Sequence, residues 1–195
     1  MLQLEIATIA LDPRTDQPVL FMKPHHDVAH AGRVLPIALG HPEATAILVA
    51  VQGVQLPRPM THDLLAGVVN TLGAHLMHVT INGFDRGTFH ANLTLAHNGE
   101  TFIIDARPSD AIALAVRLQA PVFVIDEVFA QASVAESSIN LEATVNEPPG
   151  LVDGGMLMGR THVPPREMTD AQKSRAQETK QQFHEFLEGV KPEDF

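Results

Sequence analysis

The sequence contains no cysteine, tryptophan or tyrosine among its 195 residues. The absence of cysteine excludes disulfides, thiolate metal sites and cysteine nucleophiles. Long apolar runs are also missing, since the longest candidate, residues 44–51, is far shorter than the roughly 20 residues of a membrane helix. Near the N-terminus, Glu5 and Asp12 stand where a secretory signal would have basic residues followed by an apolar block. We therefore expect a soluble, cytoplasmic protein that makes no membrane contact.

Basic residues are scarce: 13 Lys and Arg stand against 23 Asp and Glu, which gives a net charge of -10. The imbalance is even, with seven basic against twelve acidic residues over 1–130 and six against eleven over 131–195. A generic nucleic-acid binder is usually basic, so an anionic substrate would need a local arginine pocket or a metal ion. The eleven histidines show no HxH or HExxH spacing. A preformed zinc site is therefore not expected.

The apolar periodicity predicts an α+β fold, a compact single domain of mixed sheet with several short helices and a C-terminal helical extension. The expected strands cover residues 2–11, 18–23, 33–39, 77–81, 89–95, 100–106 and 121–126. Helices are expected near 41–52, 61–73, in the second half of 104–116, and near 127–132. Asn98-Gly99 predicts a tight hairpin turn, because both residues tolerate positive φ.

The composition changes after residue 132. Residues 133–168 contain EPPG, DGG and VPP and few periodic apolar positions, which predicts an irregular linker or arm. Residues 169–195 predict an amphipathic helix, whose apolar stripe consists of Phe183, Phe186, Leu187 and Val190. We expect that stripe to pack on the domain over 1–132 or on a second subunit, rather than on a separate partner.

Two segments share one pattern, RPMTHDLLAGVV at 58–69 and RPSDAIALAV at 107–116. Each has Arg-Pro, a hydroxyl residue and an aspartate before an apolar helix. The hydroxyl residue is the expected N-cap and the aspartate falls in the first turn: Thr61 and Asp63, then Ser109 and Asp110. A helix N-terminus with an arginine beside it can hold a phosphate, so Arg58 and Arg107 are candidate phosphate ligands.

The aspartates Asp63, Asp105 and Asp110 would repel a phosphate unless a divalent cation lies between them. Oxygen ligands favour hard ions, which predicts Mg²⁺ or Mn²⁺ and no organic cofactor. His62 is a candidate for proton transfer, and Glu43, at a third helix start, is a candidate to join it. The pattern alone leaves the simpler alternatives open, in which these acids stabilise helix ends, the arginines pair with them and His62 is a surface residue.

Four segments in order resemble the bifunctional nuclease domain family: LPIALGHPEATAI (35–47), GVQLPRPMTHDLL (53–65), GTFHANLTL (87–95) and IDARPSDAIALAVRLQAPVFV (104–124). The resemblance covers roughly residues 1–132 and implies a compact α+β domain that forms a homodimer or larger homo-oligomer. It also implies nuclease activity on RNA and DNA. The ending FLEGVKPEDF resembles that of bacterial members. The polar residues that match are Glu43, Arg58, Thr61, His62, Asp63, Asp105, Arg107, Ser109 and Asp110.

Two hypotheses follow. In the first, the protein is a phosphodiesterase of low sequence specificity, in which Arg58 and Arg107 bind phosphate, the three aspartates hold the cation and His62 moves a proton. Thr61 and Ser109 would support the site as helix caps. In the second, the same groups form a non-catalytic regulatory or binding module for a small anionic ligand or a protein partner.

Overall fold

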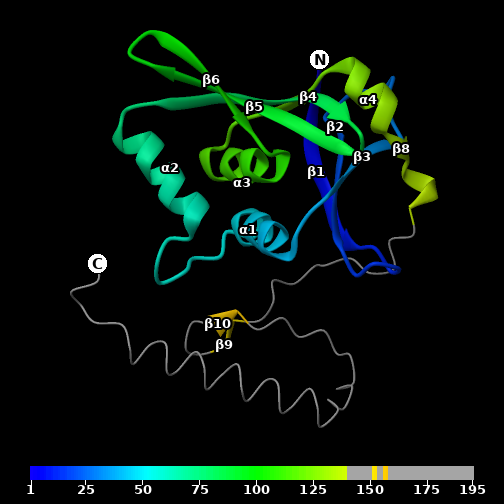
Figure 1. The fold of residues 1–195 in the computed structure, drawn as a ribbon, viewed down its shortest axis with the longest axis horizontal. Helices are drawn as coiled ribbons and strands as arrows, with labels where there is room; N and C mark the ends of the chain where they lie inside the picture. Colours follow the sequence, from blue (N-terminus) through cyan, green and yellow to red (C-terminus); the bar gives the residue numbers. More distant parts are fainter. Residues whose placement is uncertain (140–150, 153–155, 158–195) are drawn as a thin grey trace. The chain divides into compact units, whose positions relative to one another are not determined.

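The computed structural model describes residues 1–139, 151–152 and 156–157 (Figure 1). These residues belong to one compact unit, Met1–Met158. The helix predicted over 169–195 and most of the arm predicted over 133–168 lie outside the described residues. In the described part of the chain, no helix has both the length and the apolar character needed to cross a membrane.

Within the described residues, one mixed sheet of eight strands and four α-helices confirm the predicted α+β class. The sheet has the order β6-β5-β4-β7-β1-β2-β3-β8. Its strands are β1 Leu2–Leu11, β2 Pro18–Pro24, β3 Arg33–Ala38, β4 His75–Asp85, β5 Thr88–His97, β6 Glu100–Ala106, β7 Val122–Val124 and β8 Val134–Ala135. The helices are α1 His41–Val51, α2 Thr61–Thr71, α3 Pro108–Leu118 and α4 Asp126–Ala132, followed by the 3₁₀ turn η1 Glu136–Ser138. A separate antiparallel pair joins β9 Leu151–Val152 to β10 Met156–Leu157.

Local sequence accounts for most element ends. Asn98 and Gly99 have φ values of 50° and 81°, and the hairpin between β5 and β6 turns on them as predicted. Gly53 and Gly73, just beyond α1 and α2, also have positive φ, which glycine adopts without steric cost. The strand β8 pairs with β3, so the sheet continues beyond the expected domain end at residue 132.

The three-residue strand β7 joins two antiparallel meanders, β1-β2-β3 and β4-β5-β6. It pairs antiparallel with β1 and parallel with β4, which is the one parallel contact between neighbouring strands of this sheet. A parallel pair requires a long crossover connection. The chain makes that crossover through β5, β6 and α3, and so it carries α3 back across the sheet.

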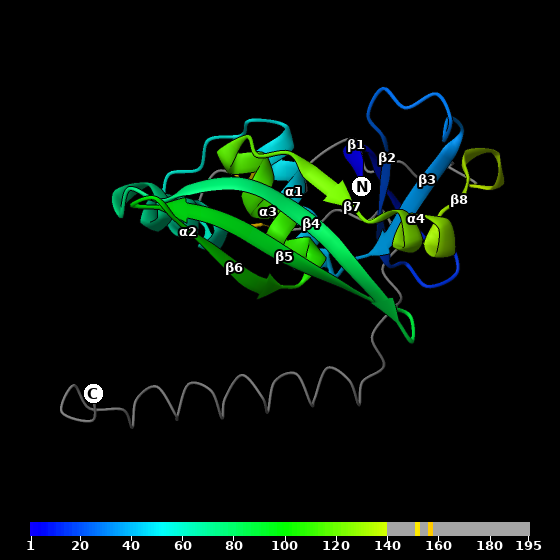
Figure 2. The same ribbon diagram turned by 90° about the horizontal axis from the view of Figure 1, so that it is seen from above.

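The helix α3 is the centre of the helical layer. Its residues 111–115 are an unbroken buried run, AIALA, and its neighbours are α1, α2, β4 and β5. Small side chains allow the neighbouring helices to approach closely, which explains the three alanines in this run. Figure 1 and Figure 2 show α1, α2 and α3 gathered on one face of the sheet, and α4 beside β3 and β8.

Candidate active site

The N-terminal ends of α1, α2 and α3 converge. The N-caps of the three helices are Gly40, Met60 and Arg107, and the third residue after each N-cap is an acid. The three acids are Glu43, Asp63 and Asp110. An acid at this position interacts favourably with the helix dipole, so each has a local structural role. Glu43 and Asp110 also meet the same arginine, which no local rule requires.

Arg107 joins α1 to α3. Its Nη1 lies 3.1 Å from Oε1 of Glu43, and its Nε donates to Oδ2 of Asp110 at 2.7 Å. Its Nη2 donates to the other oxygen of Asp110 at 3.1 Å, so this pair is bidentate. The Arg107 side chain is 66% exposed, and ion pairs that are open to solvent contribute little to the stability of a fold. The arrangement therefore fixes geometry more than it stabilises the fold.

His62 connects α2 to these side chains. Glu43, Arg107, Asp110 and His62 together form one polar network. Its Nε2 lies 3.2 Å from Oδ1 of Asp110, and its side chain is only 14% exposed. Because an ionised carboxylate can only accept, this contact assigns the proton to Nε2 and leaves Nδ1 as the acceptor nitrogen of the neutral ring. A histidine oriented by a carboxylate in this way is the usual arrangement of a general base.

The charges of the network perturb one another. Burial raises the pKa of Asp110, but the hydrogen bonds from Arg107 and His62 outweigh it, so this pKa lies below its ordinary value. The hydrogen bond to Asp110 and its charge raise the pKa of Arg107, with a further contribution from Glu43. Asp110 is therefore ionised at neutral pH, and Arg107 is balanced by two carboxylates.

A second cluster, centred on Arg117, was missed from the sequence. Arg117 is 8% exposed; its Nε donates to Asp63, and its Nη1 donates to the carbonyls of Ala46 and Ala113 at 3.0 and 2.9 Å. One side chain thus ties α1, α2 and α3 together. Burial raises the pKa of Asp63, but the hydrogen bonds from Arg117 and from the Met60 N–H outweigh it and lower this pKa. The only sequence signal was a lone arginine at the end of an apolar helix.

Asp105 lies on the other face of the sheet. Ile104 pairs with Leu93, which is buried, so this pair is on the face that carries the helices. Successive side chains of a strand point to opposite faces, and Asp105, paired with Asn92, therefore points away from α1, α2 and α3. The structure does not bring Asp105 together with Asp63 and Asp110.

The predicted capping roles of Thr61 and Ser109 are wrong. The N-caps are Met60 and Arg107, and neither N-cap side chain makes a cap hydrogen bond to its helix. Instead, the Met60 N–H donates to Oδ2 of Asp63 at 2.9 Å, which satisfies one unpaired donor from within the helix. The two similar segments thus align on Asp63 and Asp110. The segment at 58–69 has two additional residues between its arginine and its aspartate, so Arg58 lies upstream of the N-cap of α2. Arg58 is exposed and is not part of the network.

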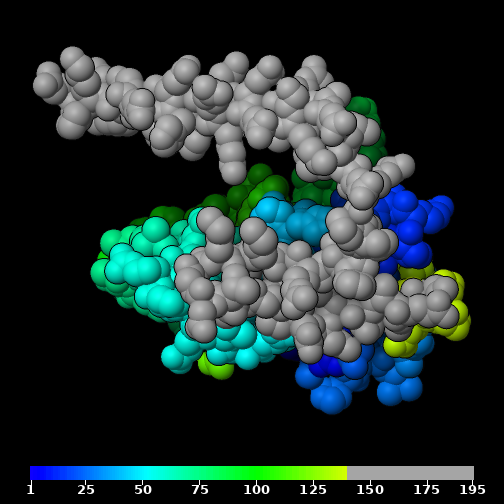
Figure 3. Space-filling view, turned by 90° about the horizontal axis from the view of Figure 1, so that it is seen from below, coloured from blue at the N-terminus to red at the C-terminus, as the bar shows by residue number. Residues whose placement is uncertain are grey.

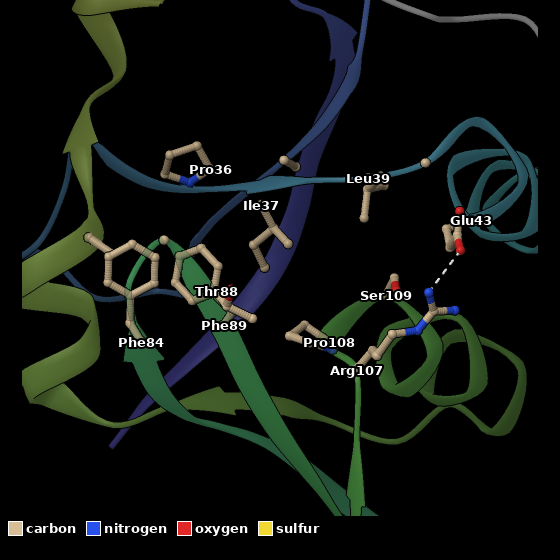
Figure 4. A pocket seen from close by; sticks show the side chains of 14 residues that line it. Pro36, Ile37, Leu39, Glu43, Phe84, Thr88, Phe89, Arg107, Pro108 and Ser109 are labelled. Atoms are coloured by element: carbon tan, nitrogen blue, oxygen red, sulfur yellow. Dashed lines mark ion pairs between the residues drawn. The ribbon is translucent and has the colours of Figure 1, made fainter.

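A cavity of about 590 Å³ opens beside the network. Glu43, Arg107 and Ser109 line one end, and Phe84 and Phe89 from the β4–β5 hairpin line the other (Figure 4). A side chain at Gly40, which also lines the cavity, would collide with the carboxylate of Glu43. Glycine at this position therefore leaves room for the Glu43 carboxylate beside Arg107.

A shared cation site on the three predicted aspartates does not fit this geometry. Asp63 is engaged by Arg117, Asp110 by Arg107 and His62, and Asp105 faces the other way. Among the described residues, no group of three histidine or acidic side chains is arranged to hold a metal ion. The use of Mg²⁺ or Mn²⁺ stays a prediction.

Residues 26–137 match the bifunctional nuclease domain. The chain belongs to the bifunctional nuclease domain family. An uncharacterised protein of Mycobacterium tuberculosis is 32% identical over 193 residues, covering 99% of this chain and 97% of that protein. Bifunctional nuclease 1 of Oryza sativa subsp. japonica is 28% identical over 109 residues, which are 52% of this chain and 33% of the plant protein. Bifunctional nuclease 1 of Arabidopsis thaliana is 30% identical, with coverage of 48% and 30%. The family match includes all four residues of the network and Arg117.

Proposed function

We propose that this protein is a nuclease that cleaves phosphodiester bonds in RNA and DNA with low sequence specificity. The observation that carries the proposal is the joining of Glu43, Arg107, Asp110 and His62, from three helices, into one network beside a cavity. The plant relatives named bifunctional nucleases support the same class of substrate. The network has an arginine for phosphate, a carboxylate-oriented histidine and three converging helix starts.

In the reaction we propose, Nδ1 of His62 takes a proton from water as the water oxygen attacks phosphorus. One P–O ester bond breaks, and the leaving oxygen takes a proton from the imidazolium or from solvent. Asp110 holds the imidazole and stabilises its charged form. Arg107 binds the phosphate oxygens after exchanging its contact with Glu43 for the substrate, which is feasible because that arginine is largely exposed.

Cleavage of end-labelled single-stranded RNA and DNA by highly purified protein tests this proposal, with Mg²⁺, Mn²⁺ or EDTA in parallel. We expect R107A and H62Q each to reduce the rate about 100-fold or more. R14A is the matched control, because Arg14 is an exposed arginine in the β1–β2 turn outside the network. Equal residual cleavage in the wild type and all variants would identify a contaminating nuclease and refute the proposal. Activity retained in EDTA would refute the predicted dependence on a divalent cation.

The aspartates must be tested singly. Asp110 touches the proposed catalytic groups, whereas Asp63 holds the helices together through Arg117. We expect D110N to lose activity with a small change in stability. We expect D63N to lose stability, so that a double replacement would confuse the two effects.

A binding function without turnover is the second candidate, and the cavity favours it. Its volume lies in the range of small-ligand sites, about 300–1,000 Å³. Arg107 is largely exposed at one end of the cavity and supplies a cationic group for a small anion. Thermal stabilisation by phosphate or nucleotides without metal, together with no cleavage, would favour this function over the first.

We also propose assembly as a homodimer or larger homo-oligomer. In the described part of the chain β6 is an edge strand, with Phe102, Ile103 and Ile104 exposed. An open strand edge with large apolar side chains favours pairing with another chain. The helix α2, teal in Figure 3, adds the exposed apolar residues Leu64, Leu65 and Val68. The cytoplasmic location stays a prediction that cell fractionation would check.

A further inference from the structure

The end of the cavity opposite Arg107 has an aromatic pair that the proposed reaction does not use. Phe84 and Phe89 face each other across the β4–β5 hairpin, with ring centroids 4.4 Å apart and planes tilted by 38°. Both are half-buried: they pack against the core and also line the cavity. Figure 4 shows the two rings at one end, and the Glu43–Arg107 ion pair at the other.

The walls between these ends are apolar where they meet the rings. Pro36 and Ile37 come from β3, and Pro108 comes from the start of α3. A ligand that fills the cavity therefore needs a flat apolar part for the rings and an anionic part for Arg107. A nucleotide has this composition, because its base presents a π-face and its phosphate is an anion. A phosphodiester alone would leave the aromatic end unfilled.

We propose that the cavity binds one unpaired nucleobase of the substrate against Phe84 and Phe89, while the adjoining phosphate lies at Arg107. The inference deepens the nuclease function proposed above and rests on it for the identity of the ligand. In a duplex the faces of each base are covered by its neighbours, and exposing one requires unstacking. The protein is therefore selective for single strands, and it accepts all bases because every base has a π-face.

Equilibrium binding of a labelled ten-nucleotide single strand, measured by fluorescence anisotropy in EDTA, tests the site without relying on turnover. F84L and F89L keep apolar volume and remove the ring. Because stacking contributes about 1–3 kcal/mol per base, we expect Kd to rise roughly 5- to 150-fold in each variant. F123L is the matched control, because Phe123 is also half-buried in a strand but does not line the cavity. We expect its Kd to equal that of the wild type.

A second measurement needs no variant. In a thermal shift assay with the wild type, adenosine monophosphate should stabilise the protein at lower concentration than ribose 5-phosphate, because only the former has a base. A fully paired duplex of the same sequence should bind at least 10-fold more weakly than the single strand. Equal stabilisation by both phosphates, or equal Kd values for F84L, F89L and F123L, would overturn the base site even if cleavage is found.

The two proposals fail in different ways. Weakened binding in F84L and F89L without any cleavage by the wild type would support the base site and refute the nuclease function. Cleavage lost in R107A, with Kd values unaffected by either phenylalanine replacement, would support the nuclease and refute the base site. A wild type that binds neither oligonucleotide nor adenosine monophosphate refutes the base site directly.

Discussion

Replacing Arg117 with methionine should destabilise the domain by about 2–3 kcal/mol. The change removes a charge-assisted hydrogen bond to Asp63, worth about 1.5–3 kcal/mol, and two bonds to the carbonyls of Ala46 and Ala113. Those carbonyls lie inside helices and keep their backbone partners, so the loss of the two hydrogen bonds from Arg117 adds little to the free-energy cost. Methionine retains most of the buried apolar stem.

Breaking a fully buried ion pair costs about 3–5 kcal/mol. The loss of stability in R117M is smaller, because Asp63 is 35% exposed and keeps its hydrogen bond from the Met60 N–H. For a chain of this length, 2–3 kcal/mol corresponds to a fall in Tm of roughly 4–12 °C. Urea denaturation followed by circular dichroism, at one fixed protein concentration, measures the free energy of unfolding. The matched control is R14M, because Arg14 is 86% exposed, and we expect a change within about 0.5 kcal/mol.

A double-mutant cycle with D63N isolates the interaction between the two side chains. We expect a coupling energy of about 1–2 kcal/mol between positions 63 and 117. A cost below about 0.5 kcal/mol for R117M, or a coupling energy near zero, would show that this arginine does not tie the helices together.

Further predictions concern pH, the cavity and assembly. Because the folded-state pKa values of Asp63 and Asp110 are lowered, the stability that these two groups contribute is complete above about pH 4 and is lost as pH falls through the folded values. In a plot of the free energy of unfolding against pH, D63N should start from a lower plateau and decline less steeply than the wild type. An unchanged profile would contradict the assignment. G40A should displace the Glu43 carboxylate from Arg107. Because that contact must be given up before the phosphate binds, the KM for single-stranded RNA should fall with little change in Tm, and an unchanged KM would show that the Glu43 position does not matter. I103K should convert oligomer to monomer in sedimentation velocity, and an unchanged sedimentation coefficient would remove β6 from the interface.

The sequence by itself determined the local elements. Alternation predicted the strands, and Asn98-Gly99 predicted the hairpin turn that the structure contains. Proline and acid at the starts of α1 and α3 predicted helices there, because these preferences depend on a few neighbouring residues. Helix starts were predicted to within two residues, but that shift moved the N-caps away from Thr61 and Ser109.

Only the tertiary structure decided which polar residues meet. The sequence grouped Asp105 with Arg107 and Asp110, yet the two-residue period of β6 turns Asp105 to the opposite face. The crossover through β5, β6 and α3 brings Arg107 to Glu43, which lies 64 positions earlier in the chain. Arg117 had no motif, because its role depends on two other helices reaching it. Short-range preferences fix elements, whereas a site is built from long-range packing, which no local pattern encodes.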